Sequence, residues 1–317
     1  MEQIGNDSLE GGNQPGVLAV WLQASRAWTL IMPFMCVSVG TAAAIRAGMF
    51  SPVRYLLGAL AAVALQAGAN MVNDYYDFAS GTDSPDWRAP ENFGPGLVIQ
   101  RGFLTPGQVW FGGIVALAAG SILGLILAYE CGWPILALGL AGVLGAYFYT
   151  AAPLQLAYRG LGDLMVFILM GPGYVLGAYY VQALSFSWPA LVASIPMGFL
   201  CSGVLQANNL RDIENDRHNG KRTMAVLIGR HAARLELALS NAGAYLATII
   251  GVVAGLVPWP ALAVLATVPR VTDQLRLVSA ERDPLRYNRA MTRSGQLQFE
   301  FALVLVITFV SARFFGL

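Results

Sequence analysis

Two clusters of carboxylate and amide side chains interrupt an otherwise apolar sequence. The first cluster is Asn73, Asp77 and Asp83, and the second is Asn208, Asp212 and Asp216. Each cluster directly follows an apolar stretch long enough to cross a membrane. Placing several anionic groups at the edge of a bilayer is costly, so such residues usually serve a function.

Helical spacing separates the residues of each cluster into faces. Those that recur at intervals of four are Asn73 and Asp77 in the first cluster, and Asn208, Asp212 and Asp216 in the second. On a helix these residues share one face. Asp74 and Glu214 fall on other faces, and we expect them to be solvated or to play a supporting part. Two carboxylate faces that met across a site of low dielectric constant would repel each other unless a cation lay between them.

The ligand types indicate which cation this is. Oxygen ligands without nearby histidine or cysteine favour magnesium over zinc. Magnesium binds one or two carboxylates and completes its shell with water and substrate phosphates, so the clusters predict a phosphate-bearing substrate. Arg26, Lys221 and Arg222 are candidates to hold the remaining phosphate oxygens. The alternative is that the carboxylates only cap helix ends and pair with arginines such as Arg211 and Arg217.

Composition places the chain in a membrane. It has 317 residues, of which 56% are hydrophobic and 12% charged, and its mean hydropathy of +0.57 is too high for a soluble domain. A net charge of +1 gives no indication of nucleic-acid binding. Cys36, Cys131 and Cys201 lie in separate apolar stretches, and we interpret them as buried thiols rather than disulfides or metal ligands.

The apolar stretches predict an all-α membrane bundle, because a spanning helix needs about 20 mostly apolar residues. The nine candidates are Trp28–Ala44, Leu56–Val72, Val109–Tyr129, Trp133–Tyr149, Leu164–Val181, Leu191–Leu205, Ala242–Val257, Trp259–Val271 and Phe299–Phe315. We expect residues 1–20 to form a disordered tail and residues 21–317 to form one transmembrane domain. The loop Gly81–Leu104, rich in proline and glycine, is a candidate lid.

Basic residues predict the orientation of this bundle. With nine spans, sixteen of the 19 lysines and arginines fall in loops on one side and three on the other. Basic loops stay in the cytoplasm, so the N-terminus is expected there and the C-terminus on the opposite side. Both clusters would then open into a polar chamber that faces the cytoplasm.

The clusters also carry a family resemblance. The pattern of Asn73, Asp77 and Asp83, together with Asp212 and Asp216, resembles the two aspartate-rich motifs of the UbiA family of intramembrane aromatic prenyltransferases. The resemblance covers almost the whole chain after residue 20. Residues 160–163 and 220–223 resemble the corresponding stretches of the family branch that prenylates 1,4-dihydroxy-2-naphthoate in menaquinone synthesis. One departure is the alanine after Arg26, where relatives commonly have proline.

The resemblance implies a reaction and a set of residue roles. A polyprenyl diphosphate would lose its diphosphate to two Mg²⁺ ions, and the allylic cation would alkylate dihydroxynaphthoate with loss of CO₂, giving demethylmenaquinone in a prokaryotic plasma membrane. The ions would be bound by Asp77, Asp83, Asp212 and Asp216. Asn73 and Asn208 would orient metal or water, Arg101 is a further phosphate candidate, and Tyr149 would stabilise the cation by about 2 kcal/mol.

Several alternatives remain open at this point. Arg26 can equally be an orientation anchor, Tyr149 an ordinary interfacial tyrosine, and Asp163 a cap of the fifth helix. Residue spacing does not exclude another aromatic acceptor, such as hydroxybenzoate. A transporter is a rival of a different class, but its acids would be expected near the midplane of the membrane and not at one face. Prenyl chain length and oligomeric state are not indicated.

Overall fold

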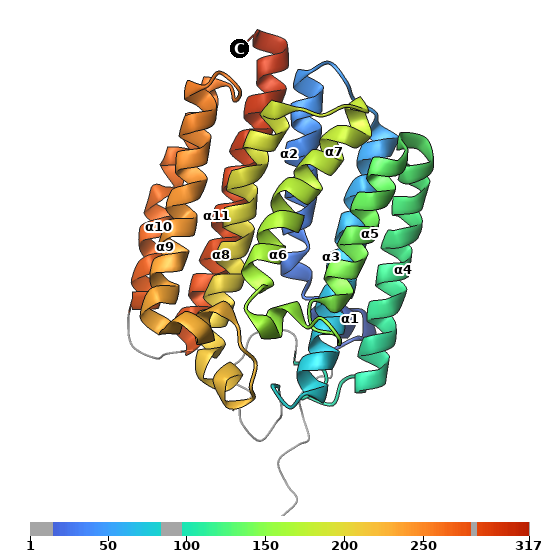
Figure 1. Cartoon of the computed structure of the whole chain (residues 1–317), viewed down its shortest axis with the longest axis vertical. Helices are drawn as coiled ribbons and strands as arrows, with labels where there is room; N and C mark the ends of the chain where they lie inside the picture. The colour runs from blue at the N-terminus through green and yellow to red at the C-terminus, as the bar shows by residue number, and fades with distance from the viewer. Residues whose placement is uncertain (1–14, 84–96, 280–283, 317) are drawn as a thin grey trace, which may run out of the picture.

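The computed structural model describes residues 15–83, 97–279 and 284–316, and every regular element in these ranges is helical (Figure 1). The helices are α1 (Val17–Ala24), α2 (Ile31–Arg46), α3 (Pro52–Ala79), α4 (Pro106–Cys131), α5 (Trp133–Phe148), α6 (Gly162–Ile168), α7 (Tyr174–Ala183), α8 (Trp188–His218), α9 (Met224–Val253), α10 (Val268–Ser279) and α11 (Pro284–Phe315). Shorter turns are η1 (Ala27–Thr29), η4 (Leu156–Arg159), η5 (Leu169–Gly173) and η6 (Trp259–Thr267).

Seven helical segments in the described part of the chain are long and apolar enough to cross a membrane. They correspond to seven of the nine predicted spans, and the chain is a multi-pass integral membrane protein. The other two predicted spans correspond to α5, which has 16 residues, and to η6 followed by α10. Both segments run alongside the longer helices in Figure 1.

The helices that carry the clusters extend beyond the predicted apolar stretches. Helix α3 continues past Val72 to Ala79, and α8 continues past Leu205 to His218. The second cluster is therefore entirely helical, and the first is helical except for Asp83, which lies in the turn after α3. At the opposite ends, the side chains of Ser51 and Ser187 accept hydrogen bonds from backbone N–H groups, and a proline occupies the first or second helical position after each serine. A cap of this kind contributes about 1 kcal/mol and fixes where the helix begins.

The predicted N-terminal tail is wrong in its last residues, because helix α1 already begins at Val17. The first 14 residues of that tail, and residues 84–96 of the candidate lid, lie outside the described ranges. After α1 the chain turns at Arg26, whose φ of 51° is left-handed, before η1 leads into α2. A residue other than glycine adopts this conformation at a cost of about 1–2 kcal/mol, so the surrounding contacts must hold it.

Helix α2 lies at the centre of the bundle and packs against α3, α7, α8 and α11. Close approach depends on small residues. A Cβ atom added at Gly40 of α2 would lie 2.1 Å from the carbonyl oxygen of Val175 in α7. Gly171 and Gly198 likewise bring η5 and α8 together, because a Cβ at Gly171 would lie 2.7 Å from the Cα of Gly198. Such contacts are typical of helix packing in membranes.

Candidate active site

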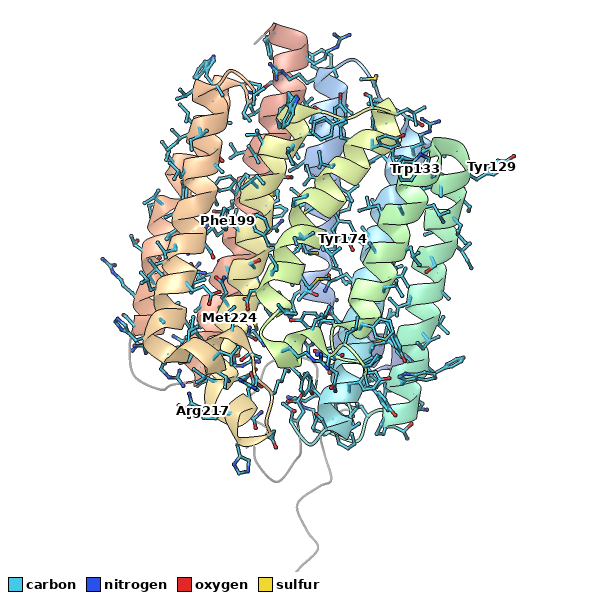
Figure 2. All side chains as sticks on the ribbon, in the orientation of Figure 1. Tyr129, Trp133, Tyr174, Phe199, Arg217 and Met224 are labelled. Carbon is cyan, nitrogen blue, oxygen red and sulfur yellow. The ribbon has the colours of Figure 1, made fainter. Side chains whose placement is uncertain are left out.

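The two clusters meet at one end of the bundle. The last turns of α3 and α8 lie at the end opposite the C-terminus (Figure 1). The side-chain amide of Asn215 donates a 2.7 Å hydrogen bond to the backbone carbonyl of Thr82, which links the second cluster directly to the first. Figure 2 shows Arg217 at this end of the molecule and Tyr129 and Trp133 at the other.

Asp77 of the first cluster has three partners among the described side chains. Its Oδ2 atom accepts hydrogen bonds from Asn73 Nδ2 at 3.0 Å and from Lys221 Nζ at 2.8 Å. Its Oδ1 atom accepts a 2.6 Å hydrogen bond from the Tyr158 hydroxyl. The predicted pairing of Asn73 with Asp77 on one helix face is confirmed. Side chains from three separate segments therefore fix the orientation of this carboxylate.

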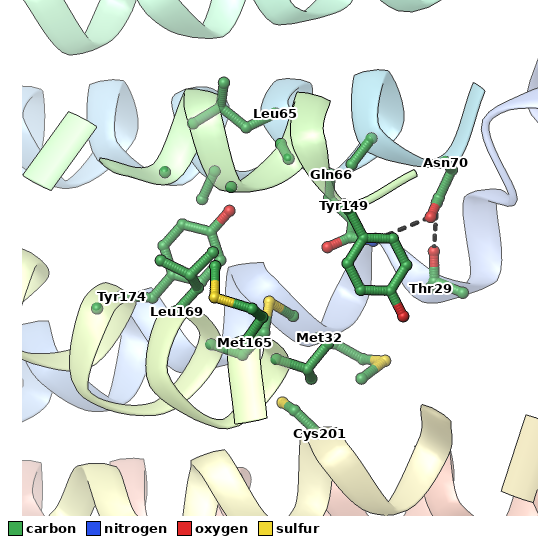
Figure 3. A pocket seen from close by; sticks show the side chains of 18 of the residues that line it. Thr29, Met32, Leu65, Gln66, Asn70, Tyr149, Met165, Leu169, Tyr174 and Cys201 are labelled. Carbon is green, nitrogen blue, oxygen red and sulfur yellow. Dashed lines mark hydrogen bonds between the residues drawn. The ribbon is translucent and has the colours of Figure 1, made fainter. Parts of the chain in front are cut away.

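Arg26 reaches the same helix from the turn between α1 and η1. Its Nη2 atom donates to Asn73 Oδ1 at 3.2 Å and forms an ion pair with Asp74. Asn70 holds this turn in place, because its Nδ2 atom donates to the Thr29 hydroxyl at 2.9 Å (Figure 3). Of the two alternatives expected for Asp74, a supporting part fits and solvation does not, since the residue is buried and pairs with Arg26, which also contacts Asn73.

The carboxylates of the second cluster also have partners in the protein. Arg211 binds Asp212 through two hydrogen bonds of 2.9 and 2.7 Å and donates a third, of 2.8 Å, to Asn208 Oδ1. Asp216 is buried and accepts a 3.4 Å hydrogen bond from the Thr223 hydroxyl. The pairing with Arg211 anticipated by the alternative interpretation is thus present. Glu214, as expected, points away and pairs with Arg217 at the surface.

The clusters line one cavity of approximately 520 Å³, here called the bundle cavity. Its wall at the cluster end includes Arg26, Asn73, Asp77, Asp83, Tyr149, Asn208, Arg211, Asp212, Asp216 and Lys221. Beyond this polar end the wall is mostly apolar, and Figure 3 shows Leu65, Met165 and Leu169 among its side chains. Two predicted phosphate ligands, Arg101 and Arg222, are exposed and are not part of the wall.

The predicted metal ligands surround the cavity without forming a compact cluster. Within the described ranges, no three histidine, cysteine or acidic side chains are close enough together to hold a metal ion. Lys221 and Arg211 instead contact Asp77 and Asp212, and so take up part of the negative charge. The donor set still fits magnesium in kind, because carboxylate and amide oxygens from α3, α8 and Asp83 line the cavity beside these cations.

Burial and nearby charges shift the pKa values of two side chains in the connections at the cluster end, Lys221 and Tyr158. Burial on its own would lower the pKa of Lys221, but the nearby charges of Asp77 and Asp216 outweigh it and hold the pKa well above its ordinary value. Burial, followed by the charge of Asp77, raises the pKa of Tyr158. Lys221 is therefore a cation and Tyr158 a neutral hydrogen-bond donor at physiological pH.

Two residues of the site were not among those predicted for a role in binding or catalysis. Tyr158 lies in the short connection between α5 and α6, where only its location on the cluster side of the membrane gave any signal. Arg211 stands in the middle of the second cluster, but the sequence indicated it only as a structural partner. Both side chains contact a predicted metal ligand directly.

Comparison with known proteins finds relatives over most of the chain. The model of the UbiA prenyltransferase family matches residues 32–294. A 1,4-dihydroxy-2-naphthoate octaprenyltransferase of Escherichia coli is 33% identical over 281 residues, 86% of this chain and 89% of the relative. A protein of the same name from Mycobacterium leprae is 36% identical over 267 residues, 83% of this chain and 87% of the relative.

The fold itself is shared with solved structures. A UbiA homolog from Archaeoglobus fulgidus, determined with DMAPP and Mg²⁺ bound, superimposes with a TM-score of 0.59 at 16% identity and covers 92% of this chain and 99% of its own. The family model spans most of the chain, and the relatives are more than 30% identical over most of their length. The chain belongs to the UbiA prenyltransferase family.

Proposed function

We propose that this protein transfers a polyprenyl group from its diphosphate to an aromatic acceptor in a magnesium-dependent reaction. The observation that carries the proposal is the bundle cavity, which has carboxylates of α3 and α8 at one end and apolar walls beyond them. The polar end suits a metal-bound diphosphate, and the apolar walls suit an isoprenoid chain. The fold neighbour from Archaeoglobus fulgidus, bound to DMAPP and Mg²⁺, supports this assignment.

The residues at the polar end would have different roles in binding the metal ions and the diphosphate. Asp77, Asp83, Asp212 and Asp216, with Asn73, would hold two magnesium ions. Bound magnesium would neutralise the diphosphate and make it a better leaving group. Lys221 now contacts the same Asp77 oxygen that Asn73 contacts, and it would transfer its hydrogen bonds to a phosphate oxygen when the donor binds. Arg26 and Arg211 are the other cations of this wall.

The acceptor we propose is 1,4-dihydroxy-2-naphthoate, with loss of CO₂ and formation of demethylmenaquinone. The names of the relatives from Escherichia coli and Mycobacterium leprae support this choice. Tyr149 lines the cavity near the polar end, where its ring would stabilise the allylic cation by about 2 kcal/mol. Asn208 would orient water or metal. Arg101 and Arg222 have less support as phosphate ligands, because their side chains lie outside the wall.

We further propose that all nine predicted segments cross the membrane, so that the cavity opens to the cytoplasm and the C-terminus lies on the opposite side of a prokaryotic plasma membrane. Residues 21–317 would act as a single domain. The distribution of basic residues supports this orientation, since sixteen of 19 fall on the cluster side of a nine-span bundle. Labelling of single cysteines placed in the loops at the two ends would test it.

The experiment that tests the function uses purified protein in lipid nanodiscs with a polyprenyl diphosphate, Mg²⁺ and either dihydroxynaphthoate or 4-hydroxybenzoate. We expect mass spectrometry to detect a decarboxylated, prenylated naphthalene product that disappears on addition of EDTA. Prenylation of hydroxybenzoate alone would refute the proposed acceptor. Absence of any prenylated product would refute the reaction.

A further inference from the structure

Asp163, in the first turn of α6, is a buried carboxyl group without a partner. The residue is 6% exposed, and within the described ranges neither of its carboxyl oxygens has a hydrogen-bond partner in another residue. It also makes no capping hydrogen bond, so the cap suggested by the sequence is absent. Leaving a buried polar group unsatisfied costs about 1–3 kcal/mol, and native proteins rarely do so without a reason.

Among the described residues, no cation compensates the charge of Asp163. On one side, the Ser202 hydroxyl of α8 donates to the backbone carbonyl of Asp163 at 3.0 Å and leaves the carboxyl group untouched. The charge that acts on this carboxyl most strongly belongs to another acid, Glu236 of α9. On the other side Asp163 lines the bundle cavity, which Glu236 does not. The unsatisfied oxygens therefore belong to a residue that borders the space a bound substrate would occupy.

The Tyr149 hydroxyl connects this place with the diphosphate end. A Cβ atom added at Gly162 would lie 3.0 Å from Tyr149 Oη, so this hydroxyl is adjacent to the backbone that carries Asp163. The charges of Asp163, Lys221 and Asp77 all act on the same hydroxyl. A molecule bound at Asp163 would thus lie next to Tyr149, within reach of the proposed allylic cation.

We propose that the Asp163 carboxyl group binds the ring hydroxyl of the aromatic acceptor. The inference rests on the proposed function, because it distinguishes between the two substrates of that reaction. A polyprenyl diphosphate presents anionic oxygens, which a carboxylate repels, and an apolar chain, which has no hydrogen-bond donor. A phenolic hydroxyl is a donor, and a carboxyl group keeps an accepting oxygen in either protonation state. The hydroxyl therefore satisfies the orphaned oxygens and holds the ring beside Tyr149.

The test compares full-length wild-type protein with Asp163→Leu and Asp163→Asn in nanodiscs. Leucine keeps the volume without a polar atom, whereas asparagine keeps one accepting oxygen. We expect Asp163→Leu to lower kcat/KM for the acceptor at least tenfold and to leave the KM for prenyl diphosphate within twofold. Asp163→Asn should recover part of the loss. The control is Glu236→Gln, which changes the neighbouring acid. Its kcat/KM for the acceptor should stay within twofold of the wild-type value.

An acceptor analogue with its ring hydroxyl methylated separates recognition from structure. For the wild type, kcat/KM should be at least tenfold lower for the methoxy compound than for the acceptor. In Asp163→Leu most of this difference in kcat/KM should disappear. If Asp163→Leu lowered kcat/KM equally for both compounds, or changed only the KM for prenyl diphosphate, the proposal would be overturned. A wild type that forms no product refutes the proposed reaction instead. In that case the affinity for dihydroxynaphthoate is measured in the absence of prenyl donor. Equal affinities of wild type and Asp163→Leu would overturn the role of Asp163.

Discussion

Replacing Tyr158 with phenylalanine isolates one hydrogen bond at the proposed metal site. The Tyr158 hydroxyl donates to Asp77 Oδ1 at 2.6 Å, a short distance typical of a hydrogen bond to a charged acceptor. Phenylalanine keeps the ring and its packing but removes the donor. Asp77 would retain Asn73 and Lys221 on its other oxygen, so the carboxylate would lose orientation without losing its charge.

The size of the effect follows from the strength of this contact. A hydrogen bond to a charged group contributes about 1.5–3 kcal/mol, and each 1.4 kcal/mol is a factor of ten, which gives roughly 10–150-fold. Removing an outer partner of a metal ligand generally costs about 10–100-fold in metal affinity. Two remaining partners on Asp77 and the partial exposure of Tyr158 favour the lower end. We expect the Mg²⁺ concentration for half-maximal rate to rise about tenfold.

The assay is a Mg²⁺ titration of the initial rate of prenyl transfer at saturating substrates. Tyr147→Phe is a matched control, because the Tyr147 hydroxyl is hydrogen-bonded to Tyr76 at 3.0 Å and not to a carboxylate of the clusters. The control should keep the wild-type midpoint. An unchanged midpoint in Tyr158→Phe, or an equal shift in both variants, would refute the assignment of Asp77 as a metal ligand oriented by Tyr158.

Three further outcomes are expected. Lys221→Met should raise the KM for prenyl diphosphate at least tenfold in a donor titration, and an unaltered KM would contradict the proposed phosphate contact. Asp77→Asn should abolish product formation even at high Mg²⁺, as measured by mass spectrometry; normal turnover would exclude it as a ligand. Gly40→Ala should destabilise the protein by about 1–3 kcal/mol, because its Cβ would meet the Val175 carbonyl at 2.1 Å. Gly124→Ala, with no atom within 4 Å, should keep its thermal midpoint.

The sequence predicted the faces of the clusters better than the ends of their helices. Intervals of four correctly indicated that Asn73 and Asp77 share a helix face, because that spacing depends only on local geometry. Hydropathy ended the second span at Val72, although α3 continues to Ala79. The reason is that this last turn borders a polar cavity, where protein groups satisfy its side chains. Hydropathy measures preference for lipid and does not register such an environment.

Long-range partners were beyond the reach of pattern reasoning. Asp74 was expected to be solvated or to play a supporting part, and the pattern did not identify its partner, Arg26, which lies 48 positions away in the chain. Tyr158 contacts Asp77 across 81 positions, and nothing in its local sequence distinguishes it from an interfacial tyrosine. Both contacts depend on how the connections between helices fold over the cluster end. Periodicity within one helix contains no information about that arrangement.

Charge balance at the polar end suggests how the donor would enter. At the cluster end of the described wall, the four carboxylates of the two clusters face three cations: Arg26, Arg211 and Lys221. A metal-free diphosphate would meet a net negative surface and would be repelled at short range. A diphosphate that carries two magnesium ions has the opposite sign and complements the same surface. The pairs Asp77–Lys221 and Asp212–Arg211 would then be resting contacts that keep buried charges neutralised until the proposed metal complex binds.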